Sequence, residues 1–229
     1  MQMNVKEVAK ILNVSEKTVY RWAQSKEIPS YRIGEQYRFN GLEILEWATA
    51  KRISIKQDIL LSQEAGEISL STLTESLKTG GINYRVGGDD KPSVLKAIID
   101  CLRLPEGADR EFLFRIFLAR ENLASTGIGD GIAIPHARTP VIFHMETPQV
   151  ALCFLEKPVE FNAMDGQTVY ALFTLICPNI KTHLKLLSSL SFALRKPSFN
   201  NALKEQASRE ELLAMAEEAE AEFYNGESI

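Results

Sequence analysis

The residues best suited to chemistry lie close together between positions 120 and 138. Three glycines stand at alternating positions in this segment, namely Gly127, Gly129 and Gly131. Without side chains, the backbone there can approach a partner or an anion closely. The next residues, Ile132-Ala133-Ile134, are typical of a strand, and Pro135 stiffens the approach to His136. A neutral imidazole is nucleophilic near neutral pH, because the reference pKa of histidine is about 6.5. The spacing therefore predicts that His136 presents one ring nitrogen beside a glycine-rich backbone.

This glycine pattern fits neither the GxGxxG dinucleotide signature nor a P-loop, since no lysine follows it. The segment instead resembles the phosphorylation motif of enzyme IIA domains of the fructose-mannitol-nitrogen class, from the bacterial phosphotransferase system. The family pattern is Arg-Glu, then Ser-Thr-Gly-Ile-Gly and Gly-Ile-Ala-Ile-Pro-His. This chain departs from it mildly, with Asp130 where Asn is common and Ala137 where Gly is frequent. The resemblance covers about residues 69–225 and implies an α/β domain with a mixed sheet flanked by helices. It also implies a phosphohistidine at His136.

Two further residues are candidates to hold the phosphoryl group. In the family a second histidine, in a context like HLKLLSSL, faces the acceptor, and His183 matches that position. It lies near the start of a helix expected from Thr182, where backbone donors and the helix dipole favour an anion. Arg120 precedes the glycines, and a guanidinium offers bidentate donors to phosphate oxygens; Arg138 is its rival. Phosphoryl transfer needs positioning and charge stabilisation more than covalent help. The resemblance therefore implies that His136, His183 and Arg120 form the catalytic set.

A metal site and a bound cofactor are not expected. A site built from all three histidines of the chain is conceivable, but neither their spacing nor nearby carboxylates support it. The third histidine, His144, is expected to be packed or to lie in an edge strand. The cysteines are odd in number and stand among apolar neighbours, at Cys101, Cys153 and Cys177. They are interpreted as reduced core residues without CxxC chemistry.

Alternating helix and strand patterns surround these residues and predict the layers that position them. Residues 92–102 are amphipathic, and Asp109 can cap a helix that ends near Arg120. Apolar runs typical of strands follow at 150–154 and 169–177. A last helix is expected from a Ser208–Glu211 capping box to about Tyr224. The glycine pairs at 80–81 and 87–88 are expected in loops. The serines at 188, 189 and 191 are expected on a polar helix face.

The first 50 residues show a different pattern, two short helices followed by a hairpin. Asn4 and Glu7 form a capping box before the first helix, and Ser15 opens the second. In that second helix an inward stripe is expected, made of Val19, Trp22 and Ala23. The outward set is Lys17, Thr18, Tyr20, Arg21 and Gln24. This order matches the geometry of a helix-turn-helix.

A hairpin is expected over residues 31–39, because alternating arms flank a turn that contains Gly34. Four apolar or aromatic side chains are expected on one of its faces, namely Tyr31, Ile33, Tyr37 and Phe39. Arg32 and Arg38 are expected on the other face. A further helix is expected to begin after Asn40, which forms a capping box with Glu43.

This order over residues 3–50 resembles the excisionase and MerR-type winged helix-turn-helix family, a small and mainly helical DNA-binding domain. In that family the second helix enters the major groove, and the hairpin, or wing, touches the backbone or the minor groove. The resemblance places four side chains near bases or phosphates, namely Thr18, Tyr20, Arg21 and Gln24. It places Arg32 and Arg38 on phosphates of double-stranded DNA. The alternative is a protein-docking module in which Arg21 and Arg38 are merely solvated. So small a module buries little DNA, so a homodimer or tandem sites would be needed.

Composition agrees with two modules. The 229 residues carry a net charge of −4 and an apolar fraction of 45%, enough for a proper core. Residues 1–56 hold 10 Lys and Arg against 6 Asp and Glu, whereas the remainder holds 16 against 24. This asymmetry favours different partners for the two ends. The expected division is 1–54 for the winged helix-turn-helix domain, 55–68 for a linker and 69–229 for the enzyme IIA-like domain. No stretch is apolar enough for a bilayer and no secretory segment leads the chain, so a cytoplasmic location is expected.

Together the two resemblances predict a cytoplasmic regulator of the nitrogen-regulatory enzyme IIA type. The histidine-containing phosphocarrier protein would phosphorylate His136, and the N-terminal module would bind DNA. One alternative is a phosphocarrier that passes the phosphoryl group to a sugar permease component, with the N-terminal module used only for docking. Another is a phosphorylation-sensitive hub for regulatory protein targets, with no DNA role.

Overall fold

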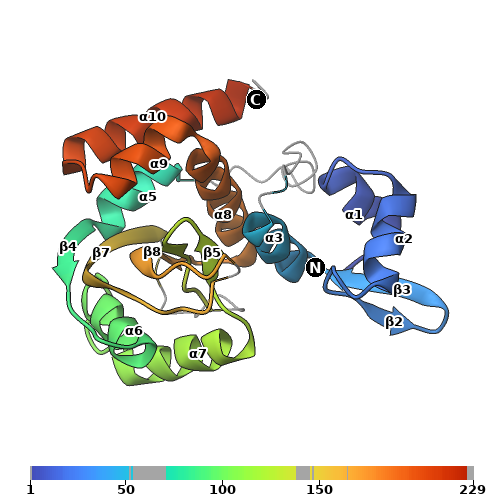
Figure 1. The fold of residues 1–229 in the computed structure, drawn as a ribbon, viewed down its shortest axis with the longest axis horizontal. Helices are drawn as coiled ribbons and strands as arrows, with labels where there is room; N and C mark the ends of the chain where they lie inside the picture. The colour runs from blue at the N-terminus through green and yellow to red at the C-terminus, as the bar shows by residue number, and fades with distance from the viewer. Residues whose placement is uncertain are drawn as a thin grey trace. The chain divides into compact units, whose positions relative to one another are not determined.

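The computed structural model describes residues 2–51, 53, 71–137, 145, 147–163 and 165–225. The chain separates into two compact units, Met1–Ser69 and Leu70–Ile229, whose folds are drawn in Figure 1. Three sequence-based expectations lie outside the described residues. They concern the linker at 55–68, Arg138 and His144.

The smaller unit contains three helices and a three-stranded sheet within its described residues. In chain order the elements are β1 (Gln2–Met3), α1 (Val5–Ile11), α2 (Glu16–Gln24), β2 (Tyr31–Ile33), β3 (Gln36–Asn40) and α3 (Gly41–Ala50). The capping box of α1 is confirmed, because the Glu7 amide donates to Asn4 Oδ1 at 3.0 Å and the Asn4 amide donates to Glu7 Oε2 at 2.7 Å. Ser15 caps α2 by accepting from the Thr18 amide at 3.1 Å. The order helix, turn, helix, hairpin, helix is the predicted one.

The β2–β3 hairpin has its side chains arranged differently from the prediction. Its two-residue loop begins at Gly34, which has φ +61°. The two strands pair Ile33 with Gln36, Arg32 with Tyr37 and Tyr31 with Arg38. Directly opposed residues of an antiparallel pair share a face. Arg32 therefore lies with Tyr37, and Arg38 lies with Tyr31. The single apolar face predicted for Tyr31, Ile33, Tyr37 and Phe39 is wrong: Tyr31 and Ile33 are exposed, whereas Phe39 is fully buried.

The larger unit is a mixed α/β domain, as predicted. Its described residues form five strands, β4 (Ile82–Val86), β5 (Gly127–Gly129), β6 (Ile132–Ala133), β7 (Gln149–Val159) and β8 (Val169–Ile176), in the order β4-β7-β8-β6-β5. The pairs β4/β7 and β6/β8 are parallel, and β7/β8 and β5/β6 are antiparallel. Its helices are α5 (Leu73–Gly80), α6 (Lys91–Asp100), α7 (Arg110–Leu123), α8 (Ile180–Arg195), α9 (Pro197–Lys204) and α10 (Arg209–Asn225). Figure 1 shows α6 and α7 on one face of the sheet, and α5, α8, α9 and α10 on the other.

Local capping signals located several of these helices correctly. Asp109 caps α7 through the Phe112 amide at 2.8 Å. The Ser208–Glu211 box opens α10, with the Ser208 amide donating to Glu211 Oε2 at 2.9 Å and the Glu211 amide donating to Ser208 Oγ at 3.3 Å. The predicted strands at 150–154 and 169–177 are the cores of β7 and β8.

Other parts of the larger unit differ from the expectations. The region around Gly80–Gly81 holds α5 and β4 instead of loops alone. Gly80 ends α5 against β7, where an added Cβ would overlap the Val150 carbonyl and lie 2.7 Å from the Ala151 amide nitrogen. The serines of α8 are buried, with Ser188, Ser189 and Ser191 at most 6% exposed. Their predicted polar outer face is wrong, because α8 packs against β8, α5, α9 and α10.

Two further findings concern membrane-spanning helices and the cysteines. Among the described residues, no helix is both long and apolar enough to cross a membrane. All three cysteines are free thiols; Cys153 and Cys177 are buried, and Cys101 is partly exposed.

Candidate functional site

The glycine-rich segment forms a tight hairpin at one edge of the sheet. Strands β5 and β6 are joined by Asp130 and Gly131, both with positive φ, at +53° and +73°. The turn is fixed from outside, because the Asp130 amide donates to Asp165 Oδ2 at 2.8 Å and the Tyr170 amide donates to the Gly131 carbonyl at 2.8 Å. Gly131 packs against the Tyr170 ring so closely that no side chain would fit there. The hairpin therefore fixes the path that the backbone takes after β6.

His136 lies on that path, three residues after β6 ends, and is only 4% exposed. Its Nδ1 lies 2.6 Å from the carbonyl oxygen of Ile134. A carbonyl can only accept a hydrogen bond, so Nδ1 carries the proton and the lone pair of the neutral ring is on Nε2. The local backbone thus leaves Nε2 as the ring nitrogen that is available to accept a proton or to act as a nucleophile.

His183 comes from α8, and its ring lies next to that of His136. It is in the first turn of α8, where Asn179 caps the helix by accepting from the Thr182 amide at 2.8 Å. The two imidazole rings lie 5.2 Å apart between centroids and are tilted by 41°, and His183 is 3% exposed. The start of a helix of this length carries partial positive charge and backbone donors. Two imidazoles beside a helix N-terminus form a suitable environment for a phosphoryl dianion.

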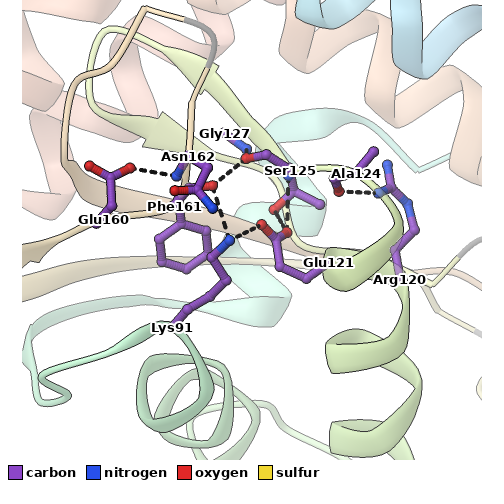
Figure 2. Close-up of polar contacts among 10 residues, drawn as sticks. Lys91, Arg120, Glu121, Ala124, Ser125, Gly127, Glu160, Phe161 and Asn162 are labelled. Atoms are coloured by element: carbon purple, nitrogen blue, oxygen red, sulfur yellow. Dashed lines mark hydrogen bonds and ion pairs between the residues drawn. The ribbon is translucent and has the colours of Figure 1, made fainter.

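Arg120 is in the last turn of α7, directly before the glycine-rich segment. It is largely buried, and its Nη1 donates to the carbonyl oxygen of Ala124 at 2.8 Å (Figure 2). This bond ties the guanidinium to the turn that leads into β5. Its contact with a phosphoryl group stays a prediction.

Two residues of this region were missed by sequence reasoning. The Glu121 carboxylate is buried beside Lys91, with 3.1 Å between Glu121 Oε1 and Lys91 Nζ. The same carboxylate accepts from the amide and hydroxyl of Thr126. The only available signal was that Glu121 follows Arg120 within the motif; nothing local indicated Lys91 as its partner.

In the smaller unit, the side chains predicted to contact DNA lie on α2 and on the hairpin. Tyr20, Arg21 and Gln24 are exposed, whereas Thr18 is half-buried with its hydroxyl 2.9 Å from Ser15 Oγ. The Tyr20 ring meets the Tyr37 ring edge-on, with 6.1 Å between centroids.

The two arginines of the hairpin differ in their surroundings. The Arg32 guanidinium lies 5.1 Å from the Tyr37 ring centroid. Arg38, on the other face, donates to Gln36 Oε1 at 2.7 Å. The structure therefore brings Arg32, but not Arg38, to the aromatic contact that joins the hairpin to α2.

Among the described residues, no group of three His, Cys, Asp or Glu side chains is placed to hold a metal ion.

Comparison with known proteins separates the same two parts of the chain. Residues 75–219 match the family model described as "Phosphoenolpyruvate-dependent sugar phosphotransferase system, EIIA 2", and residues 3–52 match a helix-turn-helix domain model. The chain is similar to a nitrogen regulatory protein of Pseudomonas aeruginosa, with 36% identity over 144 residues, 61% of this chain and 91% of that protein. It is also similar to the nitrogen regulatory protein of Escherichia coli, with 34% identity over 140 residues, 59% of this chain and 83% of that protein.

A solved structure agrees with these sequence relationships. The crystal structure of the nitrogen regulatory protein IIA-Ntr from Neisseria meningitidis superposes with a TM-score of 0.55 and 29% identity. The superposition covers 63% of this chain and 98% of the Neisseria meningitidis chain. The matched share of this chain is close in length to the larger unit, Leu70–Ile229.

Proposed function

Because the chain belongs to the EIIA 2 family of the phosphoenolpyruvate-dependent sugar phosphotransferase system, in its nitrogen-regulatory type, and carries an N-terminal helix-turn-helix domain, we propose that it is a phosphorylation-controlled DNA-binding regulator. In this proposal His136 accepts a phosphoryl group from the histidine-containing phosphocarrier protein. The observation that carries it is the pair of buried imidazoles 5.2 Å apart, one of them with Nδ1 bonded to a backbone carbonyl.

The transfer uses the tautomer that the backbone selects. Nε2 of His136 attacks the phosphorus of the carrier's phosphohistidine, and a new N–P bond forms. The carrier's N–P bond breaks, and its electron pair returns to the carrier's imidazole. Nδ1 keeps its proton throughout, and its bond to the Ile134 carbonyl stabilises positive charge that develops on the ring.

The surrounding groups stabilise the transferred oxygens. His183 and the first turn of α8 face the negative charge as it arrives. Arg120 supplies a guanidinium from the end of α7, a geometry suited to two phosphoryl oxygens. Catalysis of phosphoryl transfer consists mainly of such positioning and charge stabilisation.

The test is incubation of the full chain with phosphoenolpyruvate, enzyme I and the phosphocarrier, followed by mass measurement. We expect one phosphoryl group on the wild type and none on His136→Ala. His144→Ala is the matched control, because the chain has only three histidines, and it should be modified fully. His183→Ala should be modified more slowly. Full modification of His136→Ala would contradict the assignment.

We further propose that α2 enters the major groove of double-stranded DNA. Support comes from the exposed Tyr20, Arg21 and Gln24 on one helix, with Thr18 at its start and the Arg32 side of the hairpin next to it. Each phosphate contact releases counterions, so affinity should fall steeply with salt. Arg21→Ala should cost about 1–3 kcal/mol if this side chain reads a base. Binding that does not depend on salt, or no binding at low salt, would contradict this proposal.

The regulatory part of the proposal is that phosphorylation of His136 changes DNA occupancy or partner choice. The added group carries about two negative charges and joins a unit that is already acidic. The measurement compares the DNA affinity of unmodified and phosphorylated protein at one salt concentration. Equal affinities with an unchanged oligomeric state would show two independent functions on one chain.

A further inference from the structure

The buried Glu121 carboxylate has three polar contacts, two with Thr126 at the start of the glycine-rich hairpin and one with Lys91 of α6. The side chain is 1% exposed, and Lys91 Nζ lies 3.1 Å from its Oε1. Its Oε2 accepts from the Thr126 amide at 3.0 Å and from the Thr126 hydroxyl at 2.5 Å. A buried carboxylate is tolerated only when it is paired and hydrogen-bonded, as this one is.

A continuous path of hydrogen bonds joins this carboxylate to the imidazole of His136. Glu121 fixes Thr126 just before β5. The Thr126 carbonyl accepts from the Ile134 amide at 3.0 Å, which closes the far end of the hairpin. The Ile134 carbonyl in turn accepts from Nδ1 of His136 at 2.6 Å. Two residues, Thr126 and Ile134, thus separate Glu121 of α7 from the reacting ring.

Lys91 extends the same network to a second segment. Its ammonium donates to the Phe161 carbonyl at 3.1 Å, and the Ser125 hydroxyl donates to that same carbonyl at 2.5 Å. Ser125 Oγ also accepts from the Gly127 amide at 3.0 Å. Figure 2 shows Lys91 between Glu121 and Phe161, with Ser125 and Gly127 beside them. The start of the hairpin is therefore clamped from two sides.

We propose that Glu121, with Lys91 as its counter-ion, is a positioning residue for His136. It holds Thr126 and Ile134 so that the Ile134 carbonyl stays against Nδ1. This fixes the protonated nitrogen, keeps the lone pair on Nε2 and orients the ring toward His183. The inference rests on the proposed role of His136 as the phosphoryl acceptor.

A second buried carboxylate in the same unit offers a matched control. Glu220 of α10 is 6% exposed and accepts from two backbone amides and a threonine hydroxyl, at Leu73 and Thr74. Its chemistry is nearly that of Glu121, but its partners begin α5 instead of the glycine-rich hairpin. Loss of its charge should affect folding without affecting the reacting ring.

The experiment compares Glu121→Gln, Lys91→Met and Glu220→Gln in the full chain. Three quantities are measured: the urea midpoint of unfolding, the ¹H–¹⁵N NMR signature of the His136 ring, and the rate of phosphorylation by the phosphocarrier. We expect Glu121→Gln and Lys91→Met to populate the other ring tautomer and to lower the rate on the order of tenfold or more. Glu220→Gln should lower the urea midpoint by a similar amount and leave the ring signature and the rate as in the wild type.

The outcomes separate the positioning role from the proposed function. If Glu121→Gln keeps the wild-type ring signature and rate, the positioning role is wrong. If the signature shifts but the wild type is never phosphorylated, the positioning role stands and the acceptor role fails. If Glu121→Gln does not fold, Thr126→Val removes only the hydroxyl contact and must still shift the signature for the inference to hold. If Glu220→Gln slows phosphorylation as much as Glu121→Gln, the effect is one of stability and the inference is overturned.

Discussion

Replacement of Gly131 by alanine should destabilise the larger unit through two separate terms. Gly131 has φ +73°, a left-handed conformation that alanine adopts only with strain. An added Cβ would lie 2.5 Å from Tyr170 Cε1, closer still to Cδ1, and 3.2 Å from the Thr168 carbonyl oxygen. The backbone there cannot shift freely, because the Gly131 carbonyl accepts from the Tyr170 and Ala171 amides at 2.8 and 3.2 Å.

The magnitude follows from these two terms. The left-handed conformation costs an L-residue about 1–2 kcal/mol. Overpacking against the tyrosine ring adds about 1–3 kcal/mol. Gly131→Ala should therefore lower the free energy of unfolding by about 2–5 kcal/mol, the sum of these two ranges. Gly166→Ala is the control, because Gly166 has φ +69° and no atom within 4 Å of an added Cβ. Its free energy of unfolding should fall only by the contribution of the left-handed conformation.

The assay must report on the larger unit alone. Both tryptophans of the chain, Trp22 and Trp47, belong to the helix-turn-helix unit, so their fluorescence serves as an internal control that should not change. Amide hydrogen exchange of peptides that cover residues 127–137, measured by mass spectrometry, reports the stability of the hairpin. Equal losses of stability for Gly131→Ala and Gly166→Ala would refute the overpacking argument.

Three further predictions follow from other contacts. Arg32→Ala should weaken DNA binding and reduce the salt slope by about 1, whereas Arg38→Ala, on the opposite face of the hairpin, should change it less. The reverse order in a binding titration would contradict the proposal that the Arg32 face of the hairpin contacts DNA. The hydrogen bond from the Cys153 thiol lowers the pKa of Cys101 to about 7, so iodoacetamide should alkylate Cys101 with a midpoint near that pH. Cys153→Ala should move the midpoint upward, and an unchanged midpoint would exclude this cause. Asn179→Ala removes the cap of α8 and should cost about 0.5–2 kcal/mol in urea unfolding, with Asn179→Asp as the neutral control; equal stability of the two variants would contradict the capping role.

Local signals in the sequence located much of this fold. The Asn4–Glu7 and Ser208–Glu211 boxes and the Asp109 cap each depend on residues three positions apart, so helix starts could be predicted without tertiary information. The motif around His136 and the second histidine were instead found through a family resemblance, which rests on segments that are continuous in the chain. The meeting of His136 and His183 followed from a family resemblance and not from spacing.

The features that were missed depend on distant parts of the chain or on the exact length of a turn. Gly80 packs directly against β7, and the buried serines of α8 lie in a helix that packs against β8, α5, α9 and α10. The pairing of Lys91 with Glu121 joins the first residue of α6 to the last turns of α7, with no local pattern to indicate it. The faces of the hairpin were assigned wrongly because a two-residue loop changes which positions oppose one another.

The most direct test of the account is to identify which nitrogen of which histidine carries the phosphoryl group. Uniformly ¹⁵N-labelled protein is phosphorylated through the phosphocarrier, and long-range ¹H–¹⁵N correlations of the histidine rings are recorded before and after. The account predicts that only the His136 ring is modified, at Nε2, with Nδ1 still protonated and bonded to the Ile134 carbonyl. Phosphorylation at Nδ1 of His136, or on another histidine, would contradict it.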